Sequence, residues 1–281
     1  MKKALVNKII PFSCVDGPGN RTAVFLQGCN FSCQYCHNPE TITVCENCGE
    51  CVAYCKTGAL TFTAGKMSYD SSRCVLCDAC IRHCRKLSSP RTELLSAQET
   101  MERVRRNMPY IRGITVSGGE CTRQAEYLKE LLRLAKAEGL HTLLDSNGSY
   151  AFREDEELLD LCDGVMLDVK EADVQLHKEL TGCDNQQVLD NLVFLAEKKK
   201  LHEVRTVVMA EHFRAENTIL CTGKLLKSYL SEQNIRYKII KYRSVGVREP
   251  YRSRLVPPSD EMLERLGKLA EDIGFKEIII I

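Results

Sequence analysis

Three cysteines near the start of the chain have a spacing that suits an iron–sulfur cluster. Cys29, Cys33 and Cys36 are separated by three and then by two residues. A [4Fe–4S] cube takes four ligands, and cysteine thiolates usually supply them. If no fourth side chain joins these three, one iron stays open to a small molecule. The alternative is a zinc knuckle completed by His37, although His37 directly follows Cys36 and is poorly placed to close the same tetrahedron.

Eight further cysteines repeat one spacing twice. The run C-x2-C-x2-C-x3-C occurs at 45–55 and again at 74–84. Two such runs are typical of two-cluster ferredoxins, in which the fourth cysteine of each run ligates the cluster of the other run. The pattern therefore predicts one cluster at Cys45, Cys48, Cys51 and Cys84, and another at Cys74, Cys77, Cys80 and Cys55. Lys56 and Arg85 stand where ferredoxins usually have proline, and paired structural zinc sites are the alternative.

The number and placement of the cysteines favour metal sites over disulfides. Eleven of the 16 cysteines fall between Cys29 and Cys84, and the N-terminus has neither the apolar run nor the cleavage site of a signal peptide. No stretch is apolar enough to span a membrane. The net charge of +1 gives no reason to expect nucleic acid or a membrane as partner. We expect a soluble, cytoplasmic monomer.

Apolar strands alternate with helices outside the second cysteine group, which indicates a parallel sheet with right-handed crossovers. The strands are expected at 21–27, 113–117, 142–145, 164–169, 204–208, 235–241 and 277–281. The helices are expected at 96–107, 123–138, 154–161, 172–180, 186–199, 218–230 and 260–273. The predicted fold is an incomplete (β/α)6 TIM-type barrel of residues 1–42 and 88–281. Residues 43–87 form a small α+β ferredoxin-like insert, with a strand at 60–63, which metal would have to stabilise.

Several motifs together resemble one family. Cys-x3-Cys-x2-Cys with Tyr35 before the last cysteine resembles the radical S-adenosylmethionine superfamily. Asp16-Gly-Pro-Gly19, Gly28-Cys-Asn and Tyr35-Cys-His-Asn38 are similar to the activating enzymes of glycyl radical enzymes. The insert resembles that of the subset with two additional clusters, and the segments 9–19 and 181–187 look most like the YjjW-type activases. The resemblance covers essentially the whole chain.

This resemblance implies a site for S-adenosylmethionine at the carboxyl ends of the strands, where ligands of parallel sheets bind. The implied contacts are Tyr35, Cys36, His37, Gly118, Gly119, Glu120, Asp145, Ser146, Asp168, Val169, Lys170, Arg205 and Arg243. Arg243 stands where relatives often carry a histidine. A monovalent cation is expected near Asp145 and Asp168. Asp16, Gly17 and Gly19 are candidates for gripping the glycine loop of a partner enzyme.

The resemblance also implies a reaction. The reduced cluster at Cys29, Cys33 and Cys36 would cleave S-adenosylmethionine to methionine and a 5′-deoxyadenosyl radical, which takes a hydrogen atom from a backbone glycine of a glycyl radical enzyme. A ferredoxin or flavodoxin would supply electrons, and the two insert clusters would relay them or dock the partner. Two alternatives remain open: a radical enzyme that acts on a small molecule, and an iron–sulfur electron-transfer protein without enzymatic activity.

Overall fold

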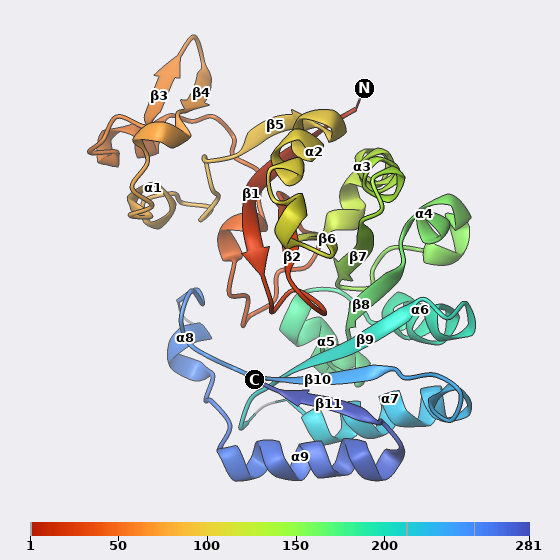
Figure 1. The fold of residues 1–281 in the computed structure, drawn as a ribbon. Helices are drawn as coiled ribbons and strands as arrows, with labels where there is room; N and C mark the ends of the chain where they lie inside the picture. Colours follow the sequence, from red (N-terminus) through yellow and green to blue (C-terminus); the bar gives the residue numbers. More distant parts are fainter. Residues whose placement is uncertain (1, 212, 250) are drawn as a thin grey trace.

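The structure is a computed structural model that describes residues 2–211, 213–249 and 251–281. These residues form a nine-stranded sheet in the order β11-β10-β9-β8-β7-β6-β2-β1-β5 (Figure 1). The first five strands of the sheet in chain order are β1 (Lys3–Ser13), β2 (Arg21–Leu26), β5 (Glu93–Ser96), β6 (Gly113–Gly118) and β7 (His141–Ser146). The others are β8 (Gly164–Asp168), β9 (Leu201–Val208), β10 (Arg236–Lys241) and β11 (Glu277–Ile280).

Strand β2 and strands β6 to β11 are the seven strands predicted from apolar runs, and neighbouring members pair in parallel. All six residues of β2 are buried, as expected for a strand covered on both faces. The antiparallel strands β1 and β5 were not predicted. Strand β1 is half-exposed, contains Pro11 and changes register twice against β2, so it lacks a continuous apolar run. Strand β5 has only four residues.

The helices outside residues 43–87 are α2 (Ala97–Arg105), α3 (Ala125–Ala137), α4 (Glu156–Leu161), α5 (Val174–Thr181), α6 (Gln186–Glu197), α7 (Ala215–Leu230), the short α8 (Tyr251–Arg254) and α9 (Asp260–Ile273). Most of them follow a parallel strand and pack on the outer face of the sheet, whereas α2 follows β5 and α8 does not cover the sheet (Figure 1). The capping box predicted at Ser96 and Glu99 is confirmed, because each side chain accepts a bond from the other's backbone amide. No helix in the described ranges is long and apolar enough to cross a membrane.

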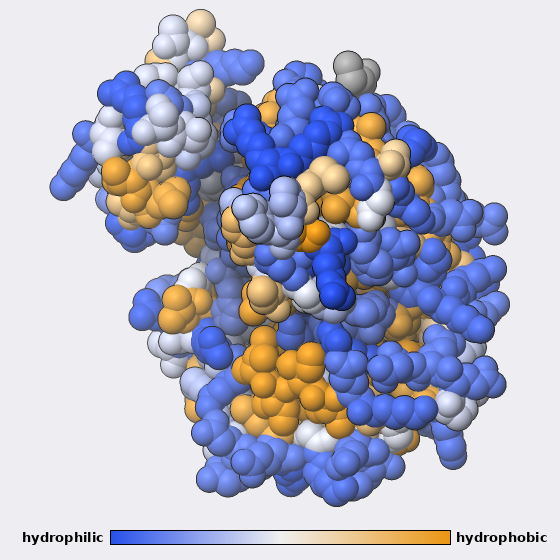
Figure 2. Space-filling model, viewed as in Figure 1, coloured by the Kyte–Doolittle hydropathy of each residue, from blue (hydrophilic) through white to orange (hydrophobic). Residues whose placement is uncertain are grey.

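Residues 43–87 fold as a small unit beside the main sheet (Figure 1) and form a lobe at the upper left of the space-filling view (Figure 2). They contain the hairpin of β3 (Leu60–Thr63) and β4 (Lys66–Tyr69) and the short α1 (Ala79–Arg82). Their own hydrophobic cluster is small, with Cys51, Leu60 and Cys80 as its buried members. The two ends of the unit meet, since Thr43 Oγ1 donates to the carbonyl of Lys86 at 3.0 Å. So little buried apolar surface gives the unit a weak core of its own.

Contacts across the inner face show that the sheet curls on itself. Lys238 on β10 donates from Nζ to the carbonyl oxygen of Val15, in the loop between β1 and β2, at 3.1 Å. Four strands separate β10 from β2 in the sheet. Further on, His37 Nε2 donates to the carbonyl of Arg243 at 2.8 Å, so the segment after β10 also reaches the cysteine loop. The curvature encloses an interior at the carboxyl ends of the strands.

His177 on α5 provides a test of this packing through pH. Its ring is fully buried and lies edge-on to Phe31 in the cysteine loop, with 5.5 Å between centroids. Burial lowers the pKa of His177, so below about pH 6.5 the unfolded chain binds a proton that the folded chain does not. Its stabilising contribution is therefore present above that pH and is lost as the pH falls.

We expect the free energy of unfolding to be smaller at pH 5.5 than at pH 7.5, and this difference to shrink in His177→Gln. Anaerobic urea titrations at both pH values measure it. Burial also lowers the pKa values of His141 and His202, so part of the slope remains in the variant. Gln175→Ala, at an exposed position on the same helix, is the control, because it removes no titratable group and should keep the wild-type slope. An unchanged pH dependence of stability in His177→Gln would contradict the contribution assigned to the buried His177.

Candidate active site

The three-cysteine loop leaves the carboxyl end of β2 and is anchored on the last turn of α5. The amide of Ser32 donates to the carbonyl of Thr181 at 2.8 Å, and the amide of Gln34 to that of Leu180 at 2.9 Å. These carbonyls lie at the end of a helix, where no further helical partner satisfies them. The loop and the helix end therefore complete each other's hydrogen bonding, which holds Cys29, Cys33 and Cys36 in place.

A cavity of about 430 Å³ opens beside these cysteines. Most of the residues predicted for the site line it, although they come from five strand ends and the cysteine loop. They are Asp16, Cys29, Cys33, Tyr35, Cys36, His37, Gly118, Gly119, Asp145, Ser146, Asp168, Lys170 and Arg205. The sequence motifs thus converge in space, as the parallel sheet requires.

Five predicted residues lie outside the cavity wall. Val169 is fully buried. Arg243 is exposed, and it meets the site only through its backbone carbonyl, so its side chain does not stand in for a histidine in this structure. Gly17 and Gly19 have positive φ angles in the turn behind Asp16. Glu120, the fifth, is described next.

Glu120 braces two loops of the site against each other. Its Oε1 accepts from the hydroxyls of Thr122 (2.6 Å) and Ser146 (3.0 Å), and its Oε2 accepts from the amide of Asn147 (2.7 Å). The side chain is 1% exposed. Glu120 is one of the contacts that the resemblance implies, and in this structure its carboxylate oxygens are engaged by groups of the chain itself. It holds the end of β7 to the loop after β6.

The two glycines before Glu120 allow a close approach of backbones. A Cβ atom at Gly118 would overlap the carbonyl oxygen of Leu26, and one at Gly119 would overlap that of Gly28. Gly118 also has a φ of 127°, which side chains rarely adopt. Only glycine therefore lets the loop after β6 lie directly against the cysteine loop.

Two buried ion pairs set the charge of the cavity. Arg205 Nη1 lies 3.0 Å from Asp145 Oδ1, and Lys170 Nζ lies 2.8 Å from Asp168 Oδ2. Burial opposes the charge of Lys170, but the nearby Asp168 and Tyr35 raise the pKa of Lys170 well above its usual value. Both cations are thus charged at neutral pH. Fixed charges of both signs suit a ligand that itself carries an ammonium and a carboxylate.

The three thiols fit a metal cluster by donor type and surroundings. Burial raises the pKa of Cys29 to about 12 and the pKa values of Cys33 and Cys36 to about 11, so the metal-free thiols are protonated at neutral pH. Iron binding would displace these protons. N–H groups already face the sulfur of Cys29, from the backbone of Phe31 at 3.4 Å and from Asn147 Nδ2 at 3.7 Å. Such donors would stabilise a bound thiolate.

Arg248 is a residue of the site that the sequence analysis missed. Its Nη2 donates to the carbonyls of Ser32 and Cys33, both at 3.0 Å. Gly246 makes this approach possible, because a Cβ there would overlap the carbonyl of His37. A glycine in the tail after β10 was the only sequence signal. Asn147, two residues after Asp145, also lines the cavity.

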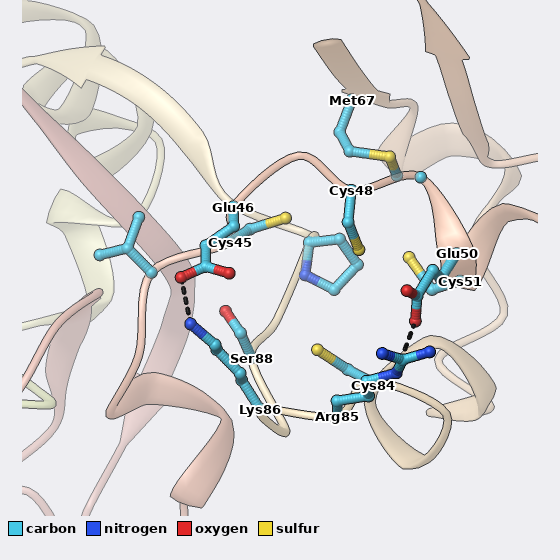
Figure 3. A pocket seen from close by; sticks show the side chains of 13 residues that line it. Cys45, Glu46, Cys48, Glu50, Cys51, Met67, Cys84, Arg85, Lys86 and Ser88 are labelled. Atoms are coloured by element: carbon cyan, nitrogen blue, oxygen red, sulfur yellow. Dashed lines mark hydrogen bonds and ion pairs between the residues drawn. The ribbon is translucent and has the colours of Figure 1, made fainter. Parts of the chain in front are cut away.

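The insert holds a second cavity of about 240 Å³, shown in Figure 3. Four cysteines from both runs line it: Cys45, Cys48, Cys51 and Cys84. This is the set that the ferredoxin pairing predicts. Ion pairs of Lys86 with Glu46 and of Arg85 with Glu50 join the two runs at its rim (Figure 3).

The other predicted set of the insert has no such cavity among those described. Cys80 is buried next to Cys51, whereas Cys77 is exposed. Within residues 2–211, 213–249 and 251–281, no three Cys, His, Asp or Glu side chains are close enough to share a single metal ion. The thiolates of a [4Fe–4S] cube stand at separate corners, so the four thiols spaced round the insert cavity fit such a cluster.

Comparisons with known proteins agree with this site. The family model of a 4Fe-4S single cluster domain matches residues 15–189. A glycyl-radical enzyme activating enzyme of Haemophilus influenzae is 31% identical, over 98% of this chain and 96% of its own length. The (2S)-3-sulfopropanediol dehydratase activating enzyme of Klebsiella oxytoca is 32% identical, over 70% of this chain and 68% of its own.

The fold has a counterpart among solved structures. QueE from Escherichia coli superposes with a TM-score of 0.56, over 99% of this chain and 94% of that one, at 12% identity. At that identity the likeness concerns the fold alone. It supports an α/β architecture with a parallel sheet.

Glu120→Gln tests the brace between the two loops. An amide in place of the carboxylate would turn an N–H group toward a donor, so we expect a loss of about 1–3 kcal/mol in the free energy of unfolding. Anaerobic urea titration measures this loss. Glu102→Gln, at an exposed position on α2, is the matched control and should stay close to wild type. Equal stability of both variants would show that the hydrogen bonds of Glu120 between the two loops do not stabilise the fold.

Proposed function

Since this chain belongs to the family of glycyl radical enzyme activating enzymes, we propose which of its residues carry out the activation. Members of this family are radical S-adenosylmethionine oxidoreductases that generate a glycyl radical in a partner protein. The observation that supports the assignment most is the single cavity that joins Cys29, Cys33 and Cys36 to the strand-end residues. We propose that the three cysteines hold a [4Fe–4S] cluster and that the cavity beside it holds S-adenosylmethionine.

When bound, the cluster supplies one electron, and S-adenosylmethionine yields methionine and a 5′-deoxyadenosyl radical that takes a hydrogen atom from a backbone glycine of the partner. The chain's own residues orient and enclose the reactants. Arg205 and Lys170 offer positive charge to the carboxylate of the ligand, while Asp145 and Asp168 offer negative charge to its ammonium or to a monovalent cation. Gly118 and Gly119 line the cavity and let the loop after β6 lie against the cysteine loop, which keeps the cavity wall close to the proposed cluster.

We propose that Asp16, Gly17 and Gly19 receive the glycine loop of the partner. Asp16 lies on the wall of the same cavity. Its carboxylate accepts from Ser13 Oγ at 2.5 Å and its carbonyl from Thr115 Oγ1 at 2.5 Å, so its position is well supported. The turn that follows carries the positive φ angles of Gly17 and Gly19, a conformation that glycine adopts without strain.

The finer assignment is a YjjW-type activase with a two-cluster insert on a partial barrel of residues 1–42 and 88–281. We propose that Cys45, Cys48, Cys51 and Cys84 bind one insert cluster and that Cys55, Cys74, Cys77 and Cys80 bind the other. The cavity shared by the first set supports the crossed pairing. A ferredoxin or flavodoxin would reduce the insert, and the enzyme would act as a cytoplasmic monomer.

The reaction is tested by anaerobic assay of the reduced protein with S-adenosylmethionine. We expect 5′-deoxyadenosine and, with the partner enzyme present, a glycyl radical signal in electron paramagnetic resonance. Cys33→Ser should reduce both to background, because the cluster loses a ligand. The control Cys221→Ser, on the outer helix α7, should retain both. Absence of 5′-deoxyadenosine under every condition would refute the assignment, and its formation without a radical in any glycyl radical enzyme would favour a small-molecule substrate.

The insert is tested by its iron content. Three [4Fe–4S] clusters correspond to about twelve iron atoms per chain. We expect Cys84→Ala to lose about four of them. Cys48→Ala should lose the same cluster, so the double variant of Cys48 and Cys84 loses no more, whereas adding Cys55→Ala removes a further cluster. A wild-type content near four irons, or additive losses for Cys48 and Cys84, would contradict the pairing.

A further inference from the structure

Lys238 contacts the loop of residues 14–20, which we proposed above to receive the partner, from the opposite side of the cavity. It lies on β10, is 7% exposed, and donates from Nζ to the carbonyl of Val15 at 3.1 Å. Val15 belongs to the loop of residues 14–20 between β1 and β2. The contact spans 223 positions of sequence and crosses the interior rather than following the sheet. No motif in the sequence drew attention to Lys238.

The loop that Lys238 holds has little apolar support of its own. The side chain of Val15 is 68% exposed, and Cys14 is exposed as well. Its backbone is held instead by polar groups on two sides of the barrel. Thr115 on β6 donates to the carbonyl of Asp16, and Lys238 on β10 donates to the carbonyl of Val15. Asn20, at the end of the loop, is also hydrogen-bonded to Tyr110 and Arg112 just before β6. Removing Lys238 would therefore leave the loop supported from the β6 side.

Glu203 keeps the ammonium of Lys238 in this position. Glu203 on β9 is fully buried, with Lys238 Nζ 3.9 Å from its Oε1 and Arg236 Nη1 3.4 Å from its Oε2. It also pairs with Arg205, the cation of the cavity wall. A buried carboxylate requires such cations around it. Lys238 therefore belongs to the charge network that reaches the proposed nucleotide site.

We propose that Lys238 is a positioning residue for the protein substrate, which fixes the loop of residues 14–20 at the cavity so that the partner's glycine meets the bound nucleotide at the right distance. Val15 and Asp16 line the same cavity as Cys29 and Arg205. A shift of about 1 Å in such an arrangement can cost a hundredfold in rate. The inference rests on the proposed function of the cavity.

Hydrogen exchange followed by mass spectrometry tests this support without the partner. In the cluster-loaded protein, Lys238→Met removes the donor while keeping the length of the side chain. We expect the amides of residues 14–20 to exchange about tenfold faster, as for the loss of one hydrogen bond to a charged group. Lys238→Arg should restore slow exchange. Lys241→Met is the control, because Lys241 lies on the same strand and pairs with Asp260 outside the barrel.

S-adenosylmethionine serves as the probe that separates the positioning role of Lys238 from the proposed nucleotide site. If it slows exchange at residues 145–148 in wild type and in Lys238→Met, the nucleotide site is intact in both. Wild-type exchange of residues 14–20 in Lys238→Met would then overturn the role of Lys238. No protection at 145–148 in any variant would instead overturn the proposed site. Should Lys238→Met fail to fold, the shorter Lys238→Gln provides the same measurement.

The ratio of 5′-deoxyadenosine to glycyl radical formed gives a second readout. With the partner present, the wild type should form about one 5′-deoxyadenosine per glycyl radical, as hydrogen transfer between two positioned reactants requires. In Lys238→Met we expect several-fold more 5′-deoxyadenosine per radical and a higher KM for the partner, with the KM for S-adenosylmethionine unchanged. A purely structural defect would lower both products together, and that outcome would contradict positioning.

Discussion

The whole site depends on one constraint, the parallel alignment of seven strands. Because β2 and β6 to β11 run in the same direction, their carboxyl ends lie at one edge, and loops from distant parts of the chain meet there. The curl of the sheet then converts that edge into an enclosed interior. The hydrophobic effect stabilises this geometry, because the strands are buried on both faces.

Burial of charge follows from the same constraint. Strand residues that face the interior of a curled sheet are largely removed from water, yet here they include the buried Glu203 and Arg205 and the partly buried Asp145. Each is tolerated because an opposite charge lies within about 3–4 Å of it. The interior is thus a polar, water-poor space. A highly reactive intermediate formed there would meet few side reactions.

Apolar runs predicted the parallel strands and the outer helices, and most of the residues expected at the site line one cavity. The crossed pairing of the insert cysteines stays a prediction, although Cys45, Cys48, Cys51 and Cys84 line a common cavity. Apolar runs could not predict β1, which lies at the side of the sheet and is held by pairing rather than by burial. The sequence cannot distinguish a carboxylate that binds a ligand from one that binds backbone amides. The bond that Glu120 accepts from the amide of Asn147 was therefore not predictable. Arg248 and Lys238 act through contacts more than 200 residues away, for which local patterns carry no signal.

Residues 43–87 leave and rejoin the main sheet unit at a single point. Thr43 and Ser88 are joined by a hydrogen bond of 2.7 Å between the hydroxyl of Ser88 and the carbonyl of Thr43. The distance that a connection between β2 and β5 must bridge is therefore short. The entropic cost of closing such a connection grows only slowly with the number of its residues. A unit of another size, or a plain turn, could occupy this point without moving a strand of the sheet. The architecture thus permits units at this point to be gained, exchanged or lost in evolution as separate parts.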